Sequence, residues 1–167
     1  DKLEEFRKEQ DGYLWQSFEP ICASADHAAI VHYSATKDSN VPVTENGLFL
    51  TDTGGGYLEG STDITRTFAF GNVPQNMKED FTSVLLCNLH LANVVFPYST
   101  TGGSLDVIGR LPLWKRGLDF NHGTGHGVGY LMNIHEEPAR FRRYLGNKAP
   151  IQDIALEPGM IITDEPG

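Results

Sequence analysis

The chain has 167 residues and a formal net charge of −9. Hydrophobic residues make up 40% of it, which is sufficient for a folded domain and excludes a disordered chain. The acidic balance disfavours a nucleic-acid-binding surface, and no apolar run is long enough to span a bilayer, so neither nucleic acid nor a membrane is an expected partner.

Hydrophobic periodicity and turn residues predict an alternation of strands and helices. In chain order we expect a charged helix over 1–10, a short strand over 28–33, hairpin arms over 48–52 and 63–70, helices over 75–96 and 104–115, a charged loop over 136–150, and two strands within 154–167. A hairpin followed by two helices and further strands is typical of an α+β fold in which helices pack on an antiparallel sheet.

The two long helices are predicted from the spacing of their apolar residues. In the second helix Ser104 is the expected N-cap, and Pro112 is expected to perturb or shorten the helix. Its apolar stripe consists of Leu105, Ile108 and Leu111. The first helix carries apolar residues at helical spacing throughout: Met77, Phe81, Val84, Leu85, Leu89, Ala92 and Phe96.

The stretch from Leu48 to Gly71 is the most informative part of the chain, because it places an aspartate at the loop end of each arm of a predicted hairpin. Asp52 ends the first arm, Asp63 opens the second, and a glycine-rich loop over 54–60 joins them. Two carboxylates held close repel each other unless a proton or a cation lies between them. A divalent metal ion would resolve this repulsion, whereas aspartates that only cap turns would explain the pair without a metal.

Residues 120–135 are rich in glycine and histidine. Glycines at alternate positions argue against a helix here, and in an extended segment His122 and His126 point to the same face. The glycines also allow a substrate or a second backbone to approach closely. A glycine-rich strand without a function is the alternative.

Several common hydrolase motifs are absent from the sequence. The run HEEP at 135–138 lacks the second histidine of the helical zinc-protease motif, because Ala139 occupies that position. No G-x-S-x-G serine elbow occurs, and neither Cys22 nor Cys87 has the setting of a nucleophile. Two cysteines are also too few for a disulfide framework, so a reducing compartment, the cytoplasm, is expected.

Four potential metal ligands lie at predicted strand ends beside turns: Asp52, Asp63, His126 and Glu165. Three carboxylates and one imidazole favour manganese, cobalt, zinc or iron(II) over an all-thiolate zinc site. Several carboxylates can bridge two metal ions, and such a pair lowers the pKa of a bound water and polarises a substrate carbonyl. The residues therefore favour a two-metal hydrolase.

Three motifs, TDTGGGYLEGSTDITRTFAFG, NHGTGHGVGYLMNIHEEP and LEPGMIITDEPG, resemble the catalytic domain of the Xaa-Pro aminopeptidase (aminopeptidase P) family. They occur in the family's order, cover nearly the whole chain and look most like the long, cytosolic type. The resemblance implies a pita-bread fold, a curved antiparallel sheet backed by helices. It also implies hydrolysis of the N-terminal residue from peptides with proline in second position. Prolidase and methionine aminopeptidase share the fold and the ligand set, so the ligands alone do not decide the substrate.

The resemblance also assigns metal-binding roles. Asp52 would bind one ion, Asp63 would bridge both, and His126 and Glu165 would hold the second. The implied cofactors are two divalent metal ions, manganese in preference to zinc or cobalt. The family often forms homodimers, so a homodimer is a further expectation.

The same resemblance assigns catalytic roles to three histidines that are not metal ligands: His32, His122 and His135. They would bind the peptide substrate and transfer protons, and the near-neutral reference pKa of histidine suits proton transfer at the leaving amine. His32 is expected on the strand before the hairpin, as the family pattern requires.

The chain departs from the family pattern in one respect. The family has a second bridging glutamate on a strand after Glu-Pro-Gly, and no glutamate follows Glu165 here. We expect a partial catalytic domain over 1–167, without the family's amino-terminal domains and final strands, that is weakly active or inactive by itself. Two other functions stay open: a prolidase-type dipeptidase, and a catalytically silent pita-bread binding domain.

Overall fold

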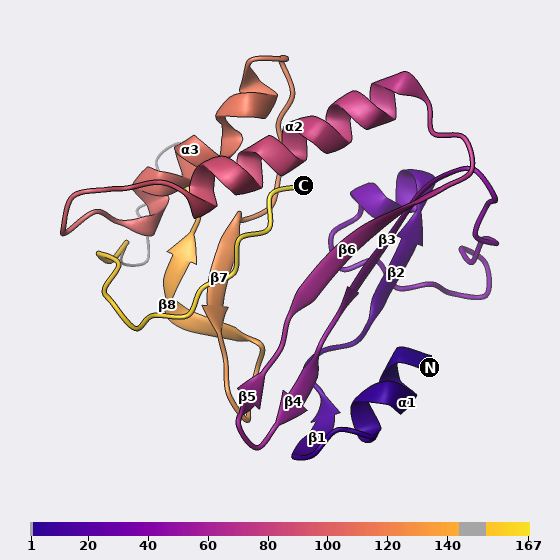
Figure 1. Ribbon diagram of the computed structural model, residues 1–167, viewed down its shortest axis with the longest axis horizontal. Coiled ribbons are helices and arrows are strands. Elements are labelled where there is room, and N and C mark those ends of the chain that lie inside the picture. The colour runs from indigo at the N-terminus through magenta and orange to yellow at the C-terminus, as the bar shows by residue number, and fades with distance from the viewer. Residues whose placement is uncertain (1, 144–152) are drawn as a thin grey trace. The chain divides into compact units, whose positions relative to one another are not determined.

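The computed structural model describes residues 2–143 and 153–167. The chain forms two compact units, of which the first comprises Asp1–Lys78 with Gly129–Ile134 and the second Glu79–Val128 with His135–Gly167. Every sheet formed by the described residues is antiparallel and helices accompany the strands, so the predicted α+β class is confirmed (Figure 1). Among the described residues, no helix combines the length and the apolar character needed to cross a membrane.

The first unit is built mostly from strands. Its elements are α1 (Lys2–Lys8), β1 (Tyr13–Gln16), β2 (Ile21–Ser24), the 3-10 helix η1 (Ala25–Ala29), β3 (Gly47–Thr53), β4 (Gly55–Tyr57), β5 (Gly60–Ser61) and β6 (Ile64–Phe70). They form two three-stranded sheets with the orders β1-β4-β5 and β2-β3-β6. The strands β3 and β6 are the two predicted hairpin arms, and α1 confirms the predicted amino-terminal helix.

The predicted loop between the hairpin arms contains two further strands. β4 pairs with both β1 and β5, and Tyr13 lies opposite Tyr57. The prediction of a loop over 54–60 was wrong because the glycines here serve close packing. A Cβ on Gly54, for example, would lie only 2.0 Å from the carbonyl oxygen of Thr62.

The predicted strand over 28–33 is not formed. After η1 the chain turns, with Ile30 N donating to His27 O at 3.1 Å and Tyr33 N donating to Ile30 O at 3.1 Å. His32 lies in this turn with a left-handed φ of +59°. β-branched residues favour a strand where a neighbouring strand pairs with them, and no described strand pairs with this stretch.

The second unit packs two helices on a two-stranded sheet. Its elements are α2 (Gln75–Ala92, whose first residues belong to the first unit), α3 (Gly102–Trp114), β7 (Gly125–Val128) and β8 (His135–Phe141). Leu91 of α2, Leu105 of α3 and Phe141 of β8 form one buried cluster. Cys87 is fully buried beside Leu113, which confirms the prediction that it is a small core residue.

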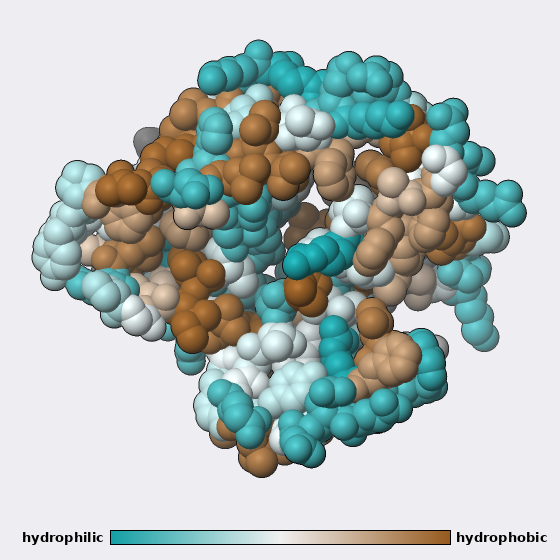
Figure 2. All heavy atoms as spheres, viewed as in Figure 1, coloured by the Kyte–Doolittle hydropathy of each residue, from teal (hydrophilic) through white to brown (hydrophobic). Residues whose placement is uncertain are grey.

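The apolar stripe predicted for α2 is not its buried face. Phe81, Leu85 and Leu89 are 44%, 46% and 44% exposed. Brown surface patches lie where Figure 1 draws α2 and α3 (Figure 2). The helix has apolar residues on more than one side, so their spacing predicts a helix without deciding which side is covered. The residues that α2 does bury are Ser83, Cys87 and Leu91.

The start of α3 also differs from the prediction. Thr101, not Ser104, is the N-cap, and its hydroxyl oxygen accepts a hydrogen bond from Ser104 N at 3.3 Å. Both residues suit a cap chemically, and the prediction was wrong because the helix begins earlier. Pro112 lies within the last turn, which continues to Trp114.

The buried face of α3 contains an ion pair. Leu105 is buried as predicted, but Leu111 of the same predicted stripe is 39% exposed. Asp106 and Arg110 are buried instead, at 0% and 3% exposure. The helix therefore turns a charged pair, rather than a continuous apolar stripe, toward the interior of the second unit.

The last part of the chain is less regular than predicted. β8 occupies the start of the predicted charged loop over 136–150, because Ala139 and Phe141 are buried beneath its charged residues. Residues 144–150 of that loop lie outside the described residues. Within 153–167, two isolated antiparallel bridges stand in place of the two predicted strands, one joining Ala155 to Thr101 and one joining Ile162 to Gly127.

Candidate metal centre

The first unit places two predicted ligands at the same end of one ladder. Asp52 of β3 pairs with Thr65 of β6, and the ladder ends at the next pair, Thr53 with Ile64. Asp63 directly precedes β6, two residues before Thr65. Side chains alternate along a strand, so both aspartates lie on the same face of the ladder. The hairpin register thus supports the predicted proximity of the two carboxylates.

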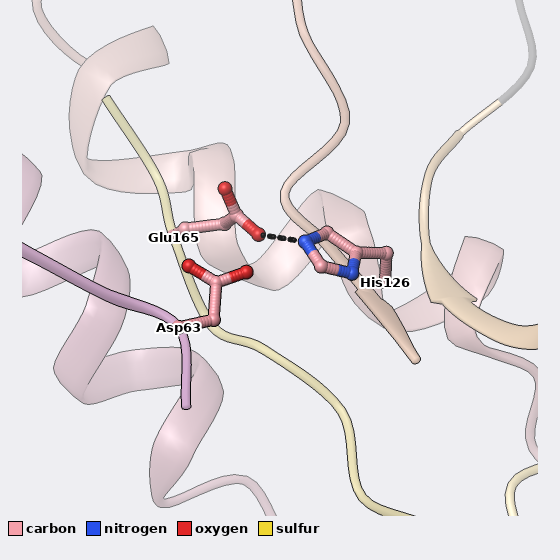
Figure 3. Close-up of side chains that lie close together, drawn as sticks. All are labelled: Asp63, His126 and Glu165. Carbon is pink, nitrogen blue, oxygen red and sulfur yellow. Dashed lines mark ion pairs between the residues drawn. The ribbon is translucent and has the colours of Figure 1, made fainter. Parts of the chain in front are cut away.

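His126 of β7 directs one ring nitrogen toward Glu165. Its Nε2 lies 3.0 Å from Glu165 Oε1 (Figure 3). The other ring nitrogen, Nδ1, lies 2.9 Å from the carbonyl oxygen of Gly127. A carbonyl oxygen only accepts hydrogen bonds, so Nδ1 carries the proton and Nε2 of the neutral ring presents a lone pair. Asp63, also drawn in Figure 3, belongs to the first unit.

The contact between His126 and Glu165 requires a positive charge. A neutral imidazole lone pair and a carboxylate oxygen at 3.0 Å repel unless a proton or a cation intervenes. Donor atoms of two neighbouring ligands of one metal ion, each about 2.1 Å from it, lie about 3.0 Å apart in octahedral and about 3.4 Å apart in tetrahedral coordination. The pair therefore fits a divalent metal ion, and a protonated His126 satisfies the same contact without one.

Glu165 is held by hydrogen bonds to Thr124, just before β7, and to Thr163. Its backbone N donates to Thr124 O at 2.8 Å, and the Thr163 hydroxyl donates to Glu165 Oε1 at 2.5 Å. Burial disfavours the charged form of Glu165, but the contact with His126 and the hydrogen bond from Thr163 outweigh it and hold the pKa of this carboxyl below its ordinary value. The close approach depends on glycine, because a Cβ on Gly125 would lie 2.0 Å from Thr163 O.

The pKa of the adjacent carboxyl, that of Asp164, is shifted in the opposite direction. Burial raises the pKa of Asp164 to about 6, Asn88 opposes this rise, and the charge of Glu165 adds to it. Both carboxyl oxygens of Asp164 are buried without a hydrogen-bond partner among the described residues. Of these two neighbours, Glu165 is therefore the carboxyl that ionises at the lower pH and that better suits a cation.

Two further histidines lie beside the His126–Glu165 pair. The His135 ring packs edge-on against the His126 ring, with centroids 4.2 Å apart. A Cβ built on Gly167 would lie 3.3 Å from His122 Nε2. His122 also contributes to the low pKa of the Glu165 carboxyl, after the larger effects of burial and of its hydrogen bonds. Both rings thus lie close to the proposed ligands of the second unit.

The seven predicted site residues are divided between the two units. The second unit brings together His122, His126, His135 and Glu165. The first unit carries Asp52, Asp63 and His32. His32 lies in a turn rather than on the expected strand, so that part of its prediction was wrong.

Sequence reasoning did not identify the residues that hold these side chains in place. Thr163 supports Glu165, and Arg110 of α3, paired with Asp106, binds the backbone of His122. The T-x-E spacing in an extended segment was an available signal for Thr163, because it puts both side chains on one face. An aspartate and an arginine four residues apart indicate a helical ion pair, but not that the pair is buried.

An α+β fold of antiparallel sheets, with a histidine–carboxylate pair suited to a divalent ion, is consistent with the expected pita-bread metallopeptidase domain. The sequence matches metallopeptidase family M24 over residues 1–167, and the chain belongs to this family.

Relatives and solved structures agree with this assignment. A probable Xaa-Pro aminopeptidase P of Talaromyces marneffei is 42% identical over 167 residues, which are 100% of this chain and 25% of that protein. Aminopeptidase P2 of Arabidopsis thaliana is 45% identical over 167 residues, 100% of this chain and 23% of that protein. The chain thus spans about a quarter of the length of the curated relatives it matches.

The fold is likewise that of solved pita-bread enzymes. X-prolyl aminopeptidase from Caenorhabditis elegans, described as a cytosolic enzyme with a di-nuclear active site, has a TM-score of 0.88 and 39% identity over 99% of this chain and 26% of that chain. Prolidase from Pyrococcus furiosus has a TM-score of 0.81 and 32% identity over 99% of this chain and 45% of that chain.

Proposed function

We propose that the protein carrying this chain is a metal-dependent aminopeptidase that removes the N-terminal residue from peptides with proline in second position. The observation that carries the proposal is the His126–Glu165 pair, whose 3.0 Å contact fits a divalent ion, in a chain of family M24. The proline preference is inferred from the relatives, which are named Xaa-Pro or X-prolyl aminopeptidases.

Four residues would hold two divalent metal ions, manganese in preference to zinc or cobalt: Asp52, Asp63, His126 and Glu165. When bound, such ions lower the pKa of a water molecule and polarise the substrate carbonyl. The three carboxylates supply three of the four negative charges that would balance two divalent ions. The hydrogen bonds of Gly127 and Thr163 orient the His126 and Glu165 side chains for this role.

Three histidines would bind the substrate and move protons: His32, His122 and His135. A proline amide nitrogen has no hydrogen, so it cannot donate to an enzyme group and must receive a proton before it leaves. An imidazolium N–H supplies that proton near neutral pH, because the reference pKa of histidine is about 6.5.

The proposal also includes a cytosolic location and a homodimeric full-length protein. It includes no nucleic-acid or membrane partner. The C. elegans enzyme is described as cytosolic. The fully buried Cys87 thiol and the exposed Cys22 thiol fit a reducing compartment.

Cleavage of dipeptides is the second candidate, because prolidase from P. furiosus is also similar over 99% of this chain. Peptide length separates the two activities. A prolidase cleaves Xaa-Pro dipeptides, whereas an aminopeptidase also cleaves longer peptides before proline.

The test uses the full-length protein loaded with manganese. Its substrates are matched peptides with proline or alanine in second position, each as a dipeptide and as a longer peptide. Loss of a residue that only hydrogen-bonds to a metal ligand lowers activity roughly 10–100-fold. His126→Ala removes a proposed ligand itself, so it should lower kcat/KM by at least that factor. His90→Ala, on the exposed side of α2, is the control and should leave kcat/KM unchanged.

Cleavage of the longer peptides only before proline supports the aminopeptidase. Cleavage confined to dipeptides moves the assignment to prolidase. If the metal-loaded protein cleaves none of the peptides, the chain belongs to a binding protein and the proposal is wrong.

A further inference from the structure

Arg110 of α3 is almost completely buried, and its guanidinium group is bonded on every side. The residue is 3% exposed. Its Nε donates to Asp106 Oδ2 at 2.8 Å, and Nη1 donates to Asp119 Oδ1 at 2.9 Å. Nη1 also donates to Phe120 O at 2.6 Å, and Nη2 donates to His122 O at 2.7 Å. Two of the four acceptors are therefore main-chain carbonyls of the segment that carries a predicted catalytic histidine.

The contact with His122 is reinforced by ring packing. The Arg110 guanidinium lies over the Phe120 ring, 3.8 Å from its centroid. The Phe120 ring packs in turn against the His122 ring, with centroids 4.8 Å apart. Arg110 thus holds both the backbone of His122 and the ring on which the imidazole rests, without contacting the imidazole nitrogens.

The other end of the segment is tied to the same helix. Asp106, which is 0% exposed, accepts a hydrogen bond from the Thr124 hydroxyl. The carbonyl oxygen of Thr124 accepts from Glu165 N at 2.8 Å. One buried ion pair therefore anchors residues 120–124 at both ends.

Stability alone does not account for this arrangement. Removing a guanidinium and a carboxylate from water costs free energy. A buried ion pair therefore often stabilises a protein no more than an apolar pair of the same volume does. What the planar guanidinium adds is geometry, because its five donors lie in a rigid fork that fixes the positions of its acceptors.

We propose that Arg110 is the positioning residue for His122. It holds the His122 imidazole in the place where that side chain binds the peptide substrate, and the inference rests on the proposed function. Arg110 acts through His122 and does not contact the substrate. Loss of the guanidinium fork should therefore lower kcat/KM only while His122 is present to be misplaced.

A double-mutant cycle in the full-length, manganese-loaded enzyme tests this. The cycle compares wild type, Arg110→Lys, His122→Ala and the double variant on a peptide cleaved before proline. Lysine keeps the charge beside Asp106, but its single nitrogen cannot replace the fork. Arg110→Lys should lower kcat/KM by about tenfold in wild type and by less than about twofold in the His122→Ala background.

Arg116→Lys is the matched control. Arg116 follows α3 and donates to Asp80 Oδ1 at 2.8 Å and Ser83 Oγ at 2.9 Å, on the side of α2. This substitution should leave kcat/KM at the wild-type value. If Arg110→Lys gives no cooperative unfolding transition, Asp119→Asn replaces it in the cycle. Asp119 accepts from Arg110 Nη1, and its substitution leaves the Asp106–Thr124 contact in place. Asp119→Asn should show a smaller loss that again disappears when His122 is alanine.

The outcomes separate this inference from the proposed function. An equal fold-loss for Arg110→Lys with and without His122, or no loss at all in an active enzyme, overturns the positioning role. A metal-loaded wild type that cleaves no peptide overturns the proposed function, and the positioning role falls with it.

Discussion

The two units hold their proposed metal ligands by different means. In the first unit, Asp52 and Asp63 owe their placement to the register of β3 and β6, which pairs seven residues of each strand. In the second unit, Glu165 lies outside any named strand, and single hydrogen bonds tie Glu165 to Thr124 and Thr163 to His126 of β7. A ladder spreads the constraint over many equivalent bonds, whereas the second arrangement depends on a few particular atoms. Single substitutions should therefore disturb the second unit more.

The largest effect is expected for Gly125→Ala in the second unit. The new Cβ would meet Thr163 O at 2.0 Å, and a backbone atom cannot move aside as a flexible side chain can. We expect a loss of about 3 kcal/mol of unfolding free energy, the upper end for overpacking. Metal affinity should fall at least about tenfold, because the support of Glu165 is lost. Urea unfolding and a metal titration measure both.

Gly123→Ala is the control for this substitution. Its Cβ would lie 3.6 Å from Arg142 Cδ, an ordinary van der Waals contact, so the unfolding free energy should change by less than about 0.5 kcal/mol. If the two variants unfold alike and bind metal alike, the second unit does not depend on the close approach at Gly125.

A smaller, pH-dependent effect is expected for Asp119→Asn, which weakens the Arg110 network. Burial disfavours the charged form of Asp119, but hydrogen bonds from Arg110 and Trp114 outweigh it and hold the pKa of this carboxyl below its ordinary value of 3.8. The charged carboxylate therefore stabilises the fold above about pH 4, and this contribution is lost as pH falls through the lowered pKa. The substitution should cost about 1.5 kcal/mol at pH 7.

Urea unfolding of wild type and Asp119→Asn at several pH values checks the sign. The difference between the two proteins should shrink below about pH 4. The exposed Asp11 of the first unit supplies the control, and Asp11→Asn should change stability by less than about 0.5 kcal/mol at every pH. A difference for Asp119→Asn that grows toward low pH would contradict the assigned direction of the shift.

The smallest effect concerns the helix that carries the network. Thr101→Ala should destabilise the protein by about 1 kcal/mol, because it removes the N-cap oxygen of α3. Ser104→Ala should cost less, since the Ser104 backbone N–H keeps its bond to Thr101 Oγ1. Thermal unfolding of both variants decides which residue caps the helix, and a larger loss for Ser104→Ala would favour the cap expected from the sequence.

Local patterns predicted the elements whose neighbours in sequence are also their neighbours in space. The β3–β6 hairpin and both long helices form near their predicted positions. Three of the errors concern which segments pair as strands, which local patterns do not specify. Residues 28–33 lack a strand to pair with, the glycines of 54–60 find one in β1, and β8 pairs with β7 despite its charges.

By itself, the sequence determined the chemistry of the candidate site. The sequence alone predicts carboxylates at the loop ends of the hairpin arms and histidines among glycines, because turn chemistry and strand alternation are local properties. Only the tertiary structure decided that His126 meets Glu165, and that Arg110 is buried against the backbone of His122. Those outcomes depend on which faces become covered when distant segments pack together, and hydrophobic periodicity does not specify the partner of a face.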